Sequence, residues 1–188
     1  MRVAAIGDLH CTTRSQGMVR ELLDGVNQDA DVLVMAGDLT NVGLPEEMDV
    51  LLEDLTFVSL PIVAVVGNHD HENDHAETLI QMLEHRGICV LSCSVCEING
   101  VGFIGTKGFC GGFDRFRVET FGERALKSFV QTSIDEAARL GKTLSQMENK
   151  RKIAILHYAP VKQTLQGESP ELYPFLGSSL LADALDRH

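Results

Sequence analysis

The chain has 188 residues, 44% of them hydrophobic and 23% charged, a balance typical of one soluble domain with a substantial core. Its formal net charge of -11 argues against non-specific binding to nucleic acid or anionic lipid, because both need concentrated Lys and Arg. There is no leader peptide or long apolar helix, and the five cysteines are odd in number, so we expect a cytoplasmic protein with free thiols and no membrane contact.

In chain order, short apolar strands alternate with amphipathic helices through the first half of the sequence. Strands are predicted over residues 2–10, 31–39 and 61–68. Helices are predicted over residues 18–28, 45–55 and 75–85. Nearly continuous apolar strands separated by helices predict a largely parallel sheet that is covered on both faces.

The second half is predicted to add antiparallel strands to this sheet system. Residues 87–106 alternate in polarity and contain Asn99-Gly100, which is a strong hairpin signal. A Gly-rich connection, a polar helix, a buried strand and a final helix follow, over residues 107–112, 120–147, 152–160 and 178–188. Cys93 and Cys96 have C-x-x-C spacing, which is more typical here of small strand side chains than of redox or zinc chemistry. A zinc or redox module built on Cys89, Cys93, Cys96 and Cys110 stays a distant alternative.

Several of the apolar runs end in residues that bind metals. Asp8 and His10 follow the first run, two positions apart, so their side chains can lie on the same side of an extended segment. Asp38 follows the second run, and its two carboxylate oxygens could bridge a pair of metal ions. Because ligands of α/β sheets sit beyond the carboxyl ends of the strands, we expect these residues to converge on one cationic site.

The third and the last apolar runs supply further candidate ligands and proton donors. Asn68 offers an amide oxygen and His157 an imidazole nitrogen, both suited to Mn, Fe or Zn. His69 is expected to point differently from Asn68 and to act as a proton donor or transition-state stabiliser. Asp70 could orient His69 through a carboxylate–imidazole hydrogen bond, or it could equally cap a turn.

Two more residues are candidate contacts to a phosphorylated substrate. Lys107 lies in the Gly-rich stretch GTKGFCGGF, where backbone N–H groups and a point charge can meet phosphate, although a simple flexible connector is the open alternative. Asn41 ends the polar cluster that begins at Asp38, and it is the second candidate.

The motifs D-x-H, GDLTN and GNHD, followed by a His at a strand end, resemble the calcineurin-like metallophosphoesterase superfamily in order and interval. The resemblance covers residues 1–188 and implies a four-layer αββα sandwich of two mixed β-sheets flanked by helices, with two divalent metal ions (Mn, Fe or Zn). It implies that Asp8, His10 and Asp38 hold one ion. It also implies that Asp38, Asn68 and His157 hold the second ion, and that His69 assists the leaving group.

The sequence departs from this family's pattern at two places. The G-H-x-H motif that completes the metal set does not occur before His188, so we expect residues 1–188 to be a single domain that lacks its C-terminal portion. Asn41-Val42-Gly43 stands where the protein-phosphatase branch has Asp-Arg-Gly, which makes a phosphoprotein substrate less expected.

The expected function is therefore a binuclear metal-dependent phosphohydrolase. It would hydrolyse a small phosphodiester, nucleotide or phosphomonoester by metal-activated water, and residues 113–150 would form a possible helical cap insertion. The alternative is the same fold used as a non-catalytic interaction module with an incomplete metal site.

Overall fold

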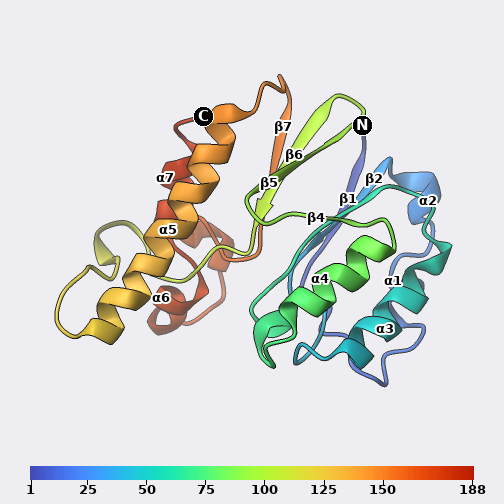
Figure 1. Cartoon of the computed structure of the whole chain (residues 1–188), viewed down its shortest axis with the longest axis horizontal. Helices are drawn as coiled ribbons and strands as arrows, with labels where there is room; N and C mark the ends of the chain where they lie inside the picture. The colour runs from blue at the N-terminus through green and yellow to red at the C-terminus, as the bar shows by residue number, and fades with distance from the viewer.

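Two β-sheets stack face to face, and each carries helices on its outer side (Figure 1). The computed structural model describes every residue of the chain, 1–188. The resulting order of layers is helices, sheet, sheet, helices. This arrangement confirms the four-layer αββα sandwich that the sequence predicts.

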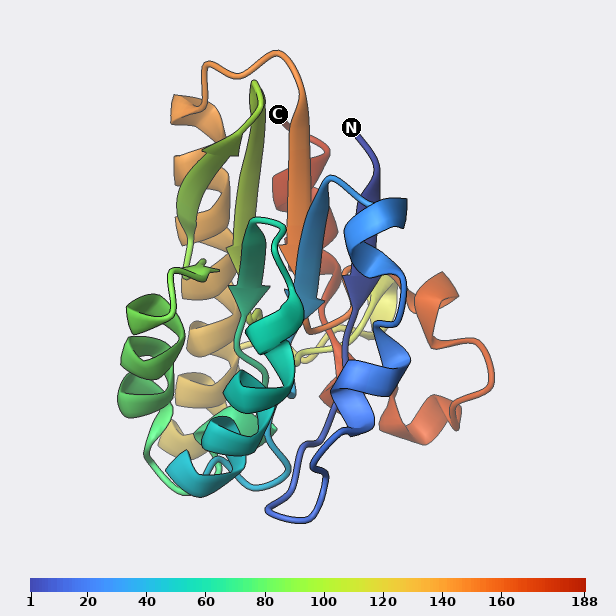
Figure 2. The same cartoon turned by 90° about the vertical axis from the view of Figure 1, so that its right-hand side faces the viewer.

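The first sheet is parallel throughout, not mixed as the resemblance implies, because a helical connection links each of its strands to the next. Its strands lie in chain order: β1 (Val3–Ile6), β2 (Val32–Ala36), β3 (Ile62–Val65) and β4 (Cys89–Val90). The helices between them are α1 (Met18–Leu22), α2 (Val26–Asp29), α3 (Pro45–Asp54) and α4 (Ala76–His85), with the short 3-10 turns η1 (Leu55–Phe57) and η2 (His69–His71). Figure 2 shows β1, β2 and β3 running side by side in the same direction.

The second sheet is mixed and has the order β5-β6-β7. The hairpin expected at Asn99-Gly100 joins β5 (Ser94–Ile98) to β6 (Val101–Thr106), with Ile98 opposite Val101. β7 (Lys152–Leu156) then pairs with β6 in parallel. On the outer face lie α5 (Arg124–Gln146) and α7 (Ser179–Leu185). Shorter elements fill the loops: η3 (Asp114–Phe116), η4 (Lys162–Leu165), η5 (Pro170–Leu172) and α6 (Tyr173–Leu176).

Alternation of side chains along the strands creates the separate apolar layers. In β2, Leu33 and Met35 face the helices of the first layer, whereas Val32 and Val34 face the second sheet. Phe103 of β6 is fully buried and meets Val32 and Val34 in the same inter-sheet cluster. Because both faces of β2 are apolar, its sequence is a continuous hydrophobic run, as expected for a central parallel strand.

Two helical predictions differ from the structure. The helix predicted over residues 18–28 is interrupted at Gly25, whose φ of 79° belongs to the left-handed region, and it therefore becomes α1 and α2. Residues 113–150, predicted as a possible cap, contain η3 and α5. In α5, Ala137, Leu140 and Leu144 form an apolar stripe at helical spacing and pack with Ile104 of β6, so α5 forms the fourth layer of the sandwich.

The structure also bears on two further expectations, the state of the cysteines and membrane-spanning helices. All five cysteines are free thiols. No helix combines the length and the apolar character that crossing a bilayer requires.

Candidate metal centre

The carboxyl ends of four strands meet at one cleft of about 650 Å³. Asp8 and His10 follow β1, Asp38 follows β2, and His157 follows β7. Asn68 and His69 follow β3, and all six of these side chains line the cleft. The structure thus brings together the five predicted metal ligands and the predicted proton donor.

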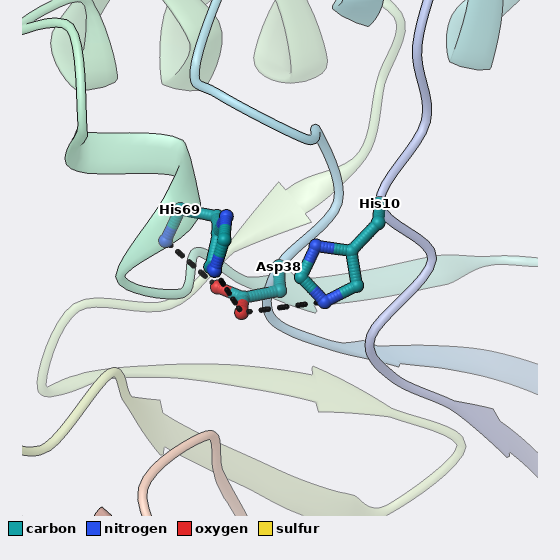
Figure 3. A group of neighbouring side chains, drawn as sticks. All are labelled: His10, Asp38 and His69. Atoms are coloured by element: carbon teal, nitrogen blue, oxygen red, sulfur yellow. Dashed lines mark hydrogen bonds and ion pairs between the residues drawn. The ribbon is translucent and has the colours of Figure 1, made fainter. Parts of the chain in front are cut away.

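Asp38 lies at the centre of this group and is only 4% exposed. Its Oδ2 lies 3.7 Å from His10 Nε2 and 4.0 Å from His69 Nε2, as Figure 3 shows. Its Oδ1 lies 3.2 Å from His157 Nε2 and accepts a 2.9 Å hydrogen bond from the His69 backbone N–H. Because the two oxygens face different imidazoles, one carboxylate can serve two cations at once.

Two sets of three donor atoms are close enough to hold an ion each. One set is His10, Asp38 and His69, and the other is Asp8, Asp38 and His157, with the donor atoms of each set within 4.8 Å of one another. The shared member is Asp38, as the sequence predicts. These sets reflect only which donor atoms lie near one another, and the first includes His69, the expected proton donor, so which donors share an ion stays a prediction.

The hydrogen bonds of His157 show that this donor set fits a metal ion. Its Nδ1 donates to the Ala36 carbonyl at 3.0 Å, so Nε2 carries the free lone pair of the neutral ring. That nitrogen faces two oxygens, Asn68 Oδ1 at 3.0 Å and Asp38 Oδ1 at 3.2 Å. Electron-rich atoms at these distances repel one another unless a proton or a cation lies among them. A site with one nitrogen donor and two oxygen donors suits Mn, Fe or Zn.

The backbone around Asp38 is shaped for close approach. Asp8, His10 and Asp38 all have positive φ angles, 53°, 45° and 49°, which non-glycine residues adopt at some energetic cost. Gly67 passes so near Asp38 that a Cβ at this position would lie 2.0 Å from Asp38 Oδ1. The fold therefore holds two chain segments, the loops after β1 and β2, out of relaxed geometry to bring these donors together.

His69 is held by a backbone carbonyl. Its Nδ1 donates to the Asn41 carbonyl at 2.6 Å, so Nε2 is the atom that points toward Asp38. The hydrogen bond to Asn41 raises the pKa of His69, burial opposes that rise, and the negative charge of Asp38 adds to it. The ring also packs edge-on against His10, with 4.5 Å between ring centroids (Figure 3).

Asp70 does not contact the His69 ring as the sequence suggested, but binds backbone N–H groups of two loops. Its buried carboxylate accepts from the backbone N–H groups of Leu39, Thr40 and Gly67 at 3.2, 2.8 and 2.7 Å, and from the Thr40 hydroxyl at 2.6 Å. The direct hydrogen bond that the sequence suggested between Asp70 and His69 is thus replaced by the Asn41 carbonyl. Asp70 instead ties the loop after β2 to the loop after β3, which is closer to the turn-capping alternative.

The two candidate substrate contacts lie just outside the cleft lining. The Lys107 ammonium sits over the rings of Phe109 and Tyr158, 5.2 and 5.4 Å from their centroids, and burial lowers its pKa. Tyr158 does line the cleft, so Lys107 packs against a residue of the cleft wall without being part of the lining. Asn41 contributes the carbonyl that holds His69, and whether its side chain meets substrate stays a prediction.

Sequence reasoning missed the residues between β7 and α7 that line the same cleft. This segment, residues 159–176, contributes Pro160, Leu165, Phe175 and Leu176 among others. It is irregular, with three short helical turns and no periodic pattern, so the only signal was its apolar side chains among prolines.

The fold and this arrangement of donors define a class of hydrolases that act on phosphate esters, and comparison with known proteins agrees. The family described as calcineurin-like phosphoesterase matches residues 1–182, and the chain belongs to this family. A 48-residue segment is 38% identical to the glycerophosphodiester phosphodiesterase GpdQ of Enterobacter lignolyticus (strain SCF1), which is 26% of this chain but only 17% of that relative's length.

A solved structure supports the fold across nearly the whole chain. The crystal structure of the phosphopantetheinyl hydrolase PptH from Mycobacterium tuberculosis aligns with 99% of this chain and 78% of its own, with a TM-score of 0.68 and 14% identity. At that identity the likeness concerns the fold alone. The family assignment supports a phosphoesterase hydrolase, and divalent metals are general in this family.

Proposed function

We propose that this chain is a binuclear metal-dependent phosphohydrolase that cleaves a small phosphodiester or phosphomonoester. The observation that carries the proposal is the buried Asp38 carboxylate, whose two oxygens face different imidazole groups. A carboxylate shared in this way is the usual link between paired metal ions in phosphatases. The structural neighbours do not identify the substrate, so the substrate class rests on the cleft itself.

Each residue has a role that follows from its position. Asp38 would hold both ions, with Asp8 and His10 contributing on the side of β1. Asn68 and His157 would complete the set on the side of β3 and β7, and His157 is oriented for this by its hydrogen bond to Ala36. Two divalent cations held there would lower the pKa of bound water and neutralise charge on the phosphate.

His69 would move the proton. The Asn41 carbonyl occupies its Nδ1 and favours the protonated ring, so Nε2 can deliver a proton to the oxygen of the departing alcohol. Because the ring is also fixed by its edge contact with His10, little reorientation is needed during the reaction.

Hydrolysis of bis(p-nitrophenyl) phosphate tests the proposal, measured after metal removal by chelation and again with Mn added. We expect activity to depend on the added metal, and Asp38→Asn or His157→Ala to lower kcat/KM by at least about 100-fold, since even residues that only support ligands change affinity or activity 10- to 100-fold. Metal analysis should give about two ions per chain in the wild type and fewer in both variants.

Two variants away from the cleft serve as matched controls. Asp54 is another buried carboxylate, and it accepts hydrogen bonds from the backbone N–H groups of Gly17 and Val19. His85 is an exposed histidine at the end of α4. Asp54→Asn and His85→Ala should retain metal content and activity. Wild-type protein that folds but binds no Mn and cleaves no phosphoester would favour the interaction-module alternative.

A further inference from the structure

Part of the cleft wall is apolar and comes from a segment without any candidate metal ligand. Between β7 and α7 the chain leaves the sheet and forms η4, η5 and α6, residues 162–176. Leu165, Phe175 and Leu176 of this segment line the cleft, together with Pro160 just before it. In Figure 2 the segment projects outward on the right, at the end of the molecule where the strands of the first sheet terminate.

This wall is held in place by backbone hydrogen bonds at its base. Ala159 N–H donates to the Leu176 carbonyl at 3.0 Å, and Ser178 N–H donates to the Ala159 carbonyl at 3.0 Å, so the two ends of the segment lie together. Gly111 N–H donates to the Pro174 carbonyl at 2.8 Å and ties α6 to the loop after β6. A wall preformed in this way can select ligands without first becoming ordered.

Apart from the histidines, the charged side chains that line the cleft are all acidic. Among its 15 lining residues none is Lys or Arg, whereas Asp8, Asp38 and Glu168 are acidic. Bound divalent cations would neutralise Asp8 and Asp38, which are candidate ligands. Glu168 belongs to the segment 159–176, is exposed, and lines the cleft beside the apolar wall. Its backbone N–H donates to the Leu165 carbonyl at 3.1 Å.

We infer that the cleft selects phosphate esters with one phosphate and an uncharged, largely apolar alcohol group, and that Glu168 disfavours a second anionic group. This inference rests on the proposed phosphohydrolase function and narrows its substrate class. The apolar part of the ester would leave water by packing on Leu165, Phe175 and Leu176. A second phosphate or carboxylate would find no guanidinium or ammonium among the lining residues, because the Lys107 ammonium lies over the rings of Phe109 and Tyr158 and is not among them. It would meet Glu168 instead, so nucleoside di- and triphosphates are poor substrates.

A matched series of three p-nitrophenyl phosphodiesters tests the inference, because the leaving group is the same in each. The second ester group is n-hexyl, 2-hydroxyethyl or 3-carboxypropyl, and kcat/KM is measured with Mn at constant ionic strength. The kcat/KM of the hexyl ester should be about 10-fold higher than that of the carboxypropyl ester. One or two buried methylenes, or one close contact between like charges, produce a ratio of this size.

Variants of the wall locate this selectivity. Glu168→Gln should raise kcat/KM of the carboxypropyl ester relative to the hexyl ester by about 3-fold, because a screened contact between like charges is removed. Phe175→Ala should lower kcat/KM of the hexyl ester by about 5-fold relative to the hydroxyethyl ester. Glu171→Gln and Leu172→Ala are matched controls from the same segment, both exposed and outside the cleft lining, and should leave the ratios unchanged.

A binding measurement separates this inference from the proposed function. Hexylphosphonate and 3-carboxypropylphosphonate have no ester bond, and calorimetry on the Mn-loaded protein should show tighter binding of the hexyl compound. Hydrolysis of all three esters at equal kcat/KM, or equal binding of the two phosphonates, would overturn the inference and leave the phosphohydrolase proposal intact. Selective phosphonate binding without hydrolysis of any ester would support the inference and overturn the proposed activity, and loss of both binding and hydrolysis would overturn both.

Discussion

Replacing Asp70 by Asn should weaken both the fold and the metal centre, although Asp70 is not itself a ligand. The side chain is fully buried, and its two oxygens share four hydrogen bonds from Leu39, Thr40 and Gly67. Asn is nearly isosteric, so the change removes charge and one acceptor without creating a cavity. If the NH2 group faces Leu39 and Gly67, two N–H donors lose their acceptor. If it faces Thr40, one N–H loses its acceptor and the Thr40 hydroxyl must turn to accept.

The magnitude follows from the one or two lost bonds. A hydrogen bond to a charged group contributes about 1.5–3 kcal/mol, so we expect the free energy of unfolding to fall by about 1.5–6 kcal/mol. This is a large part of the roughly 5–15 kcal/mol that stabilises a typical domain. Because the loops held by Asp70 carry Asp38 and Asn68, we expect Mn affinity to fall by about 10- to 100-fold, as for other residues that orient ligands.

Urea unfolding followed by circular dichroism measures the first effect, and titration of the metal-free protein with Mn measures the second. Asp54→Asn is the matched control, since Asp54 is also a buried carboxylate that accepts two backbone N–H groups. It should lower the free energy of unfolding while leaving Mn affinity unchanged. An Asp70→Asn protein with wild-type stability, or one whose Mn affinity changes no more than that of Asp54→Asn, would refute the reasoning.

Three further predictions concern the centre, the cysteines and the fourth layer. Gly67→Ala should weaken Mn binding by at least about 10-fold, because its Cβ would lie 2.0 Å from Asp38 Oδ1 and must displace that carboxylate; unchanged Mn titration would contradict this. The double variant Cys93→Ala and Cys96→Ala should keep its metal content by elemental analysis, since neither candidate metal set contains a cysteine, and loss of metal would revive the zinc alternative. Leu140→Ala should lower the free energy of unfolding in urea by about 2–4 kcal/mol, because Leu140 is fully buried between α5 and the second sheet; a change below about 1 kcal/mol would argue against that packing.

The metal-binding side of the site was accessible to sequence analysis because of how parallel sheets are built. Apolar runs followed by Asp8, Asp38, Asn68 and His157 identify strands and the residues just beyond them. The carboxyl ends of parallel strands share one edge, so residues remote in sequence must converge there. The same logic predicted the layered fold, and Asn99-Gly100 predicted the hairpin through the positive φ angles that such turns require.

The partners of individual polar groups were beyond the sequence, because they depend on loop paths. His69 and Asp70 are adjacent, yet His69 bonds to the carbonyl of Asn41, 28 residues away, and Asp70 bonds to the backbone 30 and 31 residues away. Sequence adjacency favoured a contact between the two side chains. The loop after β2 instead supplies backbone partners to both.

The sequence by itself determined the chemistry of this protein: which donors occur, at which strand ends, and hence the family and the layered architecture. Only the tertiary structure decided that Asp38 lies between imidazoles on both sides, that α5 covers the second sheet, and that residues 159–176 line the cleft with apolar side chains. The physical reason is that periodicity and residue type report local geometry and preferred environment. The identity of each partner is set by long-range packing, which the sum of many weak contacts along the whole chain selects.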